Sequence, residues 1–434
     1  MCKVVPYESL TARDDSLRYG IPMRHNIRRS FTGVLTLGCL IALTTSTPAG
    51  GVTERHLFDA LLLRYDREPD GAVKDALAAR IDAIAHQKYA TVSRLYWHVD
   101  FASATAAARQ QGWPILHLRM LGSLEQDLSC ANSRLFRATL YANQDLSQFL
   151  REHFVLYWSS ERPVPRVTID YGDGRTLQRT TAGNSAHYIL DQDGNVLDVL
   201  PGLYSPDSFR RELEGSLALV RDVRHKSAEQ RAALVADYHR QRVSAAERDW
   251  QRLAGAPLMA GLRQQPIPPR GETSLAAAQR ATVTKAAIEL RDLRVFAKGL
   301  APDAVSTDQI EVWSAAGRLL YGPGGLDEAS RALVVRLHNA STPELRANDR
   351  ELRAMIARLE QTILADTALN QLRVRPQIDR EIVRGGGRIE FSALNAWIYA
   401  QVFRTPREDA WLGLLQRDIF TGLPGDGVGW RATR

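Results

Sequence analysis

The stretch YILDQDGNVLDVLPG, at Tyr188–Gly202, decides the fold of the middle of the chain. Two apolar runs, Tyr188–Leu190 and Val196–Leu200, flank a turn-rich connection that contains the dipeptide Asp-Gly. An Asp-Gly turn between apolar runs is a strong short-range signal of a β-hairpin. Ser205 and Pro206 then supply the N-cap and first-turn proline of a helix that we expect to continue to Leu219. The sequence therefore predicts a hairpin followed by a helix.

The residues before this hairpin alternate between helix and strand signals. Phe101–Gln111 (FASATAAARQQ) reads as an Ala-rich helix, and Ile115–Leu121 (ILHLRML) as a buried strand. A polar loop leads to Cys130, after which Arg134–His153 has the apolar spacing of one long amphipathic helix. Phe154–Trp158 (FVLYW) reads as a second strand. The predicted order is helix, strand, cysteine loop, long helix, strand, hairpin and helix.

This order resembles the thioredoxin-like fold. The resemblance is carried by Pro114–Leu121 as the first central strand, by Cys130–Ser133 (CANS) at the strand-to-helix turn, and by Tyr188–Gly202. It covers residues 94–220 of the 434-residue chain. The fold class that it implies is an α/β thioredoxin-like domain at 94–220, followed by a larger, mainly α-helical domain at 221–434.

In that family the first cysteine lies at a helix N-terminus, where the helix dipole and unpaired N–H groups stabilise a thiolate. Cys130 matches that position, and Arg134 would add positive charge nearby. Ser133 replaces the resolving cysteine, so dithiol chemistry is excluded for this chain alone. The resemblance thus implies Cys130, Ser133 and Arg134 as candidate catalytic residues.

A second departure from the family concerns the substrate-aligning cis-proline, since Ser185-Ala186 stands at the matching place without a proline. Three interpretations of Cys130 remain open. It is a monothiol that forms mixed disulfides, or an inert, partly buried cysteine in a domain used for binding, or a metal ligand together with His117 and His187. The metal interpretation has no spacing motif behind it, so we expect no metal and no cofactor.

The N-terminal region has the order of a secretory signal. A basic stretch from Arg24 to Arg29 precedes the apolar block Phe31–Leu43 and the small, polar Thr44–Ala49. We expect residues 1–49 to be an N-terminal extension and signal peptide, and the protein to be periplasmic or secreted. Arg28-Arg29 leaves Sec and twin-arginine export both open. The apolar block is short for a membrane span, so only an uncleaved signal would attach the protein to a membrane.

Charge and cysteine content restrict the function classes further. The chain has a net charge of +7 and three cysteines. Residues 1–49 hold six basic and three acidic residues and two of the cysteines, which leaves the remainder at +4 with Cys130 alone. This excludes a disulfide scaffold and a four-cysteine zinc site. The mild basic charge gives no support to nucleic-acid binding.

The flanking regions read as helical. Residues 50–93 form a predicted helical lead-in, and residues 221–434 are rich in Ala, Leu, Arg and Glu, with loop signals at Gln265–Gly271, Gly322–Gly325 and Gly385–Gly387. Two calcium-loop-like segments, Asp170–Gly174 and Asp191–Gly194, lack the EF-hand spacing and are interpreted as turns.

Two residue groups of the helical region are candidate sites, one aromatic and one polar. The aromatic residues are explained as core or interface anchors, and the polar residues as a solvated face or a buried hydrogen-bond pair. The aromatic group is Trp397, Tyr399, Phe403, Trp411, Phe420 and Trp430; the polar group is Asp366, Asn370, Arg373 and Arg375.

Two functions remain from the sequence. The first is a binding or assembly role for a thioredoxin-like protein that lacks dithiol chemistry. The alternative is a monothiol oxidoreductase or isomerase that uses Cys130, so the sequence leaves open whether the protein is an enzyme. The expected partner is a protein or a thiol-containing substrate, and not a nucleic acid.

Overall fold

The computed structural model describes residues 53–181, 183–254, 274–280, 307–339, 347–409 and 411–412. The chain divides into two units, 1–51 and 52–434, and all described residues belong to the second. The predicted signal peptide lies outside the described residues. Among the residues that are described, no helix is both long and apolar enough to cross a membrane.

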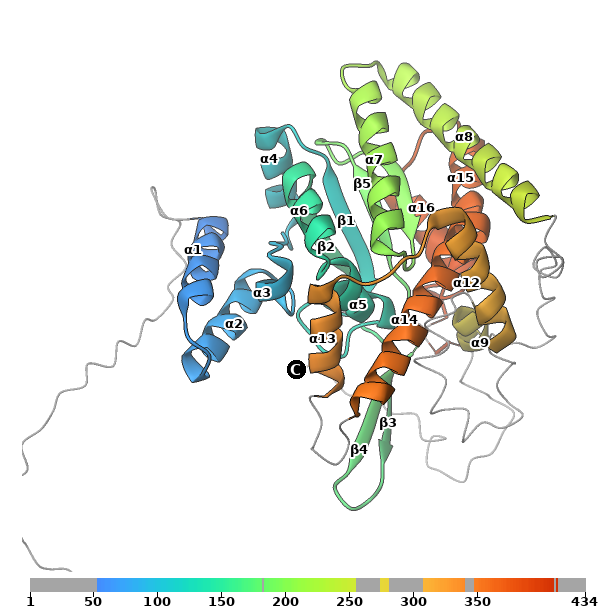
Figure 1. Cartoon of the computed structure of the whole chain (residues 1–434). Coiled ribbons are helices and arrows are strands. Elements are labelled where there is room, and N and C mark those ends of the chain that lie inside the picture. Colours follow the sequence, from blue (N-terminus) through green and yellow to red (C-terminus); the bar gives the residue numbers. More distant parts are fainter. Residues whose placement is uncertain are drawn as a thin grey trace, which may run out of the picture. The chain divides into compact units, whose positions relative to one another are not determined.

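A mixed four-stranded sheet organises residues 94–220 (Figure 1). Its strand order is β2-β1-β5-β6. β1 runs parallel to β2, whereas β5 is antiparallel to both β1 and β6. The strands are β1 (Ile115–Leu121), β2 (Val155–Arg162), β5 (Ala186–Leu190) and β6 (Val196–Pro201). The predicted strand at 115–121 and the predicted hairpin after residue 188 are both confirmed.

Helix α4 (Phe101–Gln111) precedes β1 with the bounds that the sequence predicts. Its N-cap is Asp100, whose carboxylate accepts from the Ser103 N–H at 2.7 Å, and Gly112 ends it with a φ of 68°. Glycine adopts this left-handed conformation without the steric cost that other residues incur. The helix α7 (Pro206–Val223) follows the hairpin and begins at the predicted Ser-Pro cap.

The predicted single helix at 134–153 is wrong. The structure has three segments instead: α5 (Ala131–Leu135), the π-helical η1 (Phe136–Leu140) and α6 (Gln144–His153). The side chain of Asn143 accepts from the Leu146 N–H at 2.9 Å and caps a new helix there. Because Asn competes for backbone hydrogen bonds, it favours this cap over a helix interior.

Both edges of the sheet are covered by other parts of the chain. At the β2 edge, His98 donates its N–H to Leu156 O at 2.8 Å and accepts from Trp158 N–H at 3.1 Å. At the β6 edge, the His239 ring hydrogen-bonds with Leu197 O at 3.0 Å. These contacts satisfy backbone groups that an exposed edge strand leaves unpaired.

A separate two-stranded ribbon follows β2. It consists of β3 (Arg166–Asp170) and β4 (Thr176–Thr180), which pair in antiparallel register. The predicted turn at Asp170–Gly174 connects them, with Gly172 and Gly174 at positive φ. Apart from Thr180, these strand residues are exposed or half-buried.

The lead-in forms a small hydrophobic cluster of its own around Phe58 and Ile81, both 0% exposed. Its helices are α1 (Glu54–Arg67), α2 (Ala72–Ile84) and α3 (Ala90–Ser93).

The described part of residues 221–412 is helical, as predicted. The helices are α8 (Ala228–Ala254), α9 (Ser274–Arg280), α12 (Thr307–Tyr321), α13 (Glu328–His338), α14 (Asp349–Leu369), η4 (Asn370–Val374), α15 (Arg375–Arg384), α16 (Phe391–Trp397) and η5 (Ile398–Val402). Asn348 and Glu351 form a capping box at the start of α14. The predicted loop at Gly385–Gly387 follows α15 and lies against α8, where a Cβ on Gly387 would be 2.0 Å from Ala232 O.

One hydrophobic core joins the sheet to the C-terminal helices. Leu116 and Leu200 of the sheet belong to the same buried cluster as Ile378 of α15, Ile398 of η5 and Phe403. The domain boundary predicted at residues 220 and 221 falls within α7. The two predicted domains therefore share buried apolar surface, which is the main favourable contribution to folding.

Candidate functional site

Cys130 is the N-cap residue of α5, at the carboxyl end of β1. Its backbone N–H donates to Leu121 O at 3.3 Å, which holds the loop from β1 closed. The thiol is 0% exposed. Sγ lies 3.3 Å from Ser133 Oγ and 3.0 Å from Ser185 Oγ. The helix-start position that the resemblance implies for Cys130 is present, and the thiol there is fully buried.

The segment 183–185 covers the thiol directly. A Cβ on Gly183 would lie 2.3 Å from Cys130 Cβ, so the two backbones are closer than any side chain at 183 would allow. The next residue, Asn184, is held from the other side, because Tyr399 of η5 donates its hydroxyl to Asn184 O at 3.3 Å. Tyr399 is itself 2% exposed. The segment 183–185 therefore closes over Cys130.

Ser133 contacts Cys130, but Arg134 does not point toward it. Arg134 Nη2 donates to Thr180 Oγ1 at 3.0 Å. The cation that hydrogen bonds connect to the thiol is Arg137. It is 2% exposed and donates to Ser129 Oγ at 3.2 Å. Ser133 donates to the same Ser129 oxygen at 2.8 Å. A chain of hydroxyl groups therefore connects Arg137 with Cys130.

Helical spacing places Arg137 as well as Arg134 near Cys130, because residues 133, 134 and 137 follow residue 130 at i+3, i+4 and i+7 of one helix face. Burial lowers the pKa of Arg137 from its ordinary value. Arg137 also donates to Leu124 O at 2.6 Å, so it fixes the loop before Cys130. Sequence reasoning could have found Arg137 from this spacing.

The two histidines considered as ligands lie on opposite faces of the sheet. His117 pairs in register with Tyr188, and His187 with Leu118, so alternation along the strands separates the two rings. His117 is 2.7 Å from Ser159 Oγ, and His187 is 2.7 Å from the Tyr141 hydroxyl. Burial lowers the pKa of each ring to about 3, so both are neutral. The structure does not bring them together with Cys130 as a ligand set.

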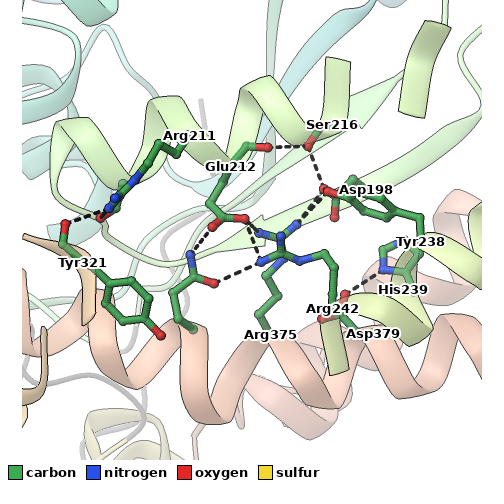
Figure 2. Close-up of polar contacts among 12 residues, drawn as sticks. Asp198, Arg211, Glu212, Ser216, Tyr238, His239, Arg242, Tyr321, Arg375 and Asp379 are labelled. Atoms are coloured by element: carbon green, nitrogen blue, oxygen red, sulfur yellow. Dashed lines mark hydrogen bonds and ion pairs between the residues drawn. The ribbon is translucent and has the colours of Figure 1, made fainter. Parts of the chain in front are cut away.

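A second buried polar cluster joins the sheet to the C-terminal helices (Figure 2). Arg375 at the start of α15 and Asp198 in β6 are both 0% exposed, and Arg375 Nη2 lies 2.6 Å from Asp198 Oδ2. Arg375 also contacts Glu212 of α7, and Arg242 of α8 lies 2.7 Å from Glu212. We call these four residues, Asp198, Glu212, Arg242 and Arg375, the ionic cluster.

Further hydrogen bonds satisfy Asp198. Ser216 and Tyr238 donate their hydroxyls to Asp198 Oδ2 at 2.7 and 2.8 Å. Burial would raise the pKa of Asp198, but the positive charge of Arg375, with that of Arg242, and the hydrogen bond from Ser216 outweigh it and bring the pKa to about 2. Asp198 is therefore a carboxylate at neutral pH, which a buried position permits only with such partners.

Asp198, His239 and Asp379 have the residue types and spacing of a metal centre, with ligand atoms within 4.8 Å of one another. Each is already engaged. His239 Nδ1 lies 2.6 Å from Asp379 Oδ1, and His239 Nε2 lies 3.0 Å from Leu197 O. The guanidinium of Arg375 holds the position of a cation beside Asp198. The geometry therefore favours a structural ion cluster over metal binding.

Sequence reasoning singled out Arg375 only as one polar residue of a stretch, and missed Asp198, Glu212 and His239. One signal was present, since Asp198 stands inside the apolar run VLDVLP. A carboxylate in a buried strand requires a partner. Asn370, another member of the polar group named from the sequence, is also buried and donates to Leu203 O at 2.7 Å.

Two members of the aromatic group lie in the core. Tyr399 and Phe403 are each 2% exposed, whereas Trp397 is half-buried and Trp411 is 39% exposed. Phe420 and Trp430 lie outside the described residues.

Comparison with protein-family models, curated proteins and solved structures found no match for this chain.

Proposed function

We propose that residues 94–220 form a thioredoxin-like domain that has lost thiol chemistry and serves a binding or assembly role. The order of elements supports this, with a cysteine at the helix start after the first central strand and a hairpin followed by a Ser-Pro-capped helix. The observation that carries the loss of chemistry is the burial of Cys130 beneath Gly183. A nucleophile must reach its substrate, and this thiol has no open face.

The alternative is a monothiol oxidoreductase or isomerase, and one observation favours it. Cys130 has hydroxyl partners on two sides and a hydroxyl connection to Arg137. These groups would stabilise a thiolate by hydrogen bonding if the segment 183–185 moved away. Ser133 and Arg137 would then be positioning residues.

Exposure of the native chain to oxidised glutathione separates the two functions. Formation of a mixed disulfide is read by mass spectrometry on the peptide that contains Cys130, and Cys130→Ala serves as the blank. The binding role predicts no adduct at Cys130 under native conditions and full adduct formation after unfolding. A native adduct that a reductant reverses would establish the monothiol alternative.

We also propose that the protein acts in the periplasm or is secreted, on the basis of the signal-like order of residues 24–49. Expression in a bacterial host with an export pathway tests this. The mature N-terminus is expected at Gly50. Retention of residues 1–49 in a cytoplasmic fraction would contradict export.

A further inference from the structure

A pocket of about 250 Å³ lies at the amino end of β1, the end of this strand opposite Cys130. Three connections form it. They are the turn 112–114 between α4 and β1, the turn 191–193 between β5 and β6, and residues 220–231 around the end of α7. The pocket is therefore built by the sheet and its helices, and it is separate from both buried clusters.

Both carboxylates that line the pocket are already engaged. Asp191 Oδ1 accepts from the backbone N–H groups of Asp193 and Asn195, each at 2.9 Å, and Asp191 Oδ2 contacts the guanidinium of Arg231. Asp193 accepts from Arg109 Nε at 3.0 Å. The negative charge of the lining is thus neutralised by two ion pairs.

The positive charge of the lining is not neutralised in this way. Arg224 and Lys226 are exposed lining residues, and neither has a carboxylate partner among the described residues. Arg224 donates through Nη2 to Gly112 O at 2.6 Å, which places its guanidinium beside the turn 112–114. A basic residue at the end of a helix complements the helix dipole. This effect accounts for one of the two basic residues, and not for both of them at one pocket.

Part of the pocket lining is apolar. Trp113 is half-buried against the core, and Pro114, Val220 and Val223 also line the pocket. Apolar surface beside a few convergent charged groups can bind a small molecule and fix its orientation. We propose that the pocket binds a small organic anion, whose phosphate or carboxylate is held by Arg224 and Lys226 and whose apolar body lies on Trp113.

Calorimetric titration of the full chain tests the proposal. Phenyl phosphate and benzoate are the aromatic probes, and inorganic phosphate is the control anion that has no apolar part. At least one aromatic probe is expected to bind, and to bind more tightly than inorganic phosphate. Arg224→Gln and Lys226→Gln are each expected to weaken binding roughly tenfold, as the loss of one charge-assisted hydrogen bond does. Arg221→Gln removes the same charge from the exposed face of α7 outside the lining, and is expected to leave affinity unchanged.

Three results would overturn the proposal. The first is an absence of binding by both aromatic probes at about 10 mM, a concentration at which even a weak site is occupied. The second is equal weakening by Arg221→Gln, which would indicate a general charge effect. The third is equal affinity for phosphate and for the aromatic probes, which would exclude the role of Trp113.

Discussion

Cys130 and Arg375 are each 0% exposed, yet the surroundings of these two polar residues differ in charge. Cys130 contacts neutral hydroxyl groups and a glycine backbone. Arg375 contacts two carboxylates from two different elements, β6 and α7. Removal of one member costs a buried neutral cluster less free energy than it costs a buried ion cluster, which is left with an uncompensated charge. We therefore expect substitutions in the ionic cluster to destabilise the fold more than substitutions around Cys130.

The largest expected effect is that of Arg375→Met. It leaves the buried Asp198 without its closest cation, whereas Glu212 keeps Arg242, so we expect the free energy of unfolding to fall by about 3–5 kcal/mol. Urea denaturation of the variant measures this. Arg380→Met on the same helix is the matched control, because Arg380 pairs with Glu247 at 3.5 Å on the surface and its side chain is 54% exposed. Similar losses from the two variants would contradict the special role of the cluster.

The contact between Gly183 and Cys130 predicts the next effect. Gly183→Ala places a methyl group against Cys130 Cβ, so we expect a loss of about 1–3 kcal/mol from overpacking. Adding Cys130→Gly removes the clashing atom, and the double variant is expected to be less destabilised than the sum of the single variants. A double-mutant cycle in urea measures the difference. Strict additivity would show that residue 183 does not seal the thiol.

The pH dependence of stability tests whether the buried ring of His187 is neutral. Its folded pKa of about 3 is depressed below the ordinary value of 6.5, so it contributes stability above pH 6.5 that is lost as the pH falls toward 3. Between pH 6 and pH 5 we expect this one group to lower the free energy of unfolding by about 1 kcal/mol. His187→Gln keeps a hydrogen-bonding group opposite Tyr141 and is expected to remove this part of the pH dependence. An unchanged pH dependence in the variant would contradict a neutral, buried ring.

The smallest effect is expected for Cys130→Ala. The substitution removes one sulfur atom and its weak hydrogen bonds, and the remaining Cβ still fits beneath Gly183. We expect a loss of about 1 kcal/mol in urea denaturation and an unchanged fold. A loss as large as that of Arg375→Met would mean that the thiol is part of the structural framework, and the contrast between the two regions would fail.

The parts of the fold that local sequence determines were predictable. Ile115–Leu121 is a mainly apolar run that follows the helix-breaking Gly112 and Pro114, and it forms β1 with the predicted bounds. Asp100 and Gly112 bracket α4 in the same way. Each of these signals lies within a few residues of the element that it sets.

The parts that depend on distant residues were not predictable. Asp198 and Arg375 are 177 residues apart, and no local pattern indicates that they meet. The cover over Cys130 has the same origin, since Tyr399 reaches Asn184 across 215 residues. The ionic cluster and the burial of the thiol are both consequences of how the C-terminal helices pack onto the sheet, which periodicity in one segment does not encode.

The thiol of Cys130 is sealed in the native protein. The alkylation rate of Cys130 by iodoacetamide, read on its own peptide by mass spectrometry in the full chain, tests this most directly, with the urea-unfolded chain as the reference. If labelling requires an opening that costs about 4 kcal/mol, the native rate is expected to be about a thousandfold below the unfolded rate. A native rate equal to or above the unfolded rate would show an accessible, reactive thiol and would contradict the account.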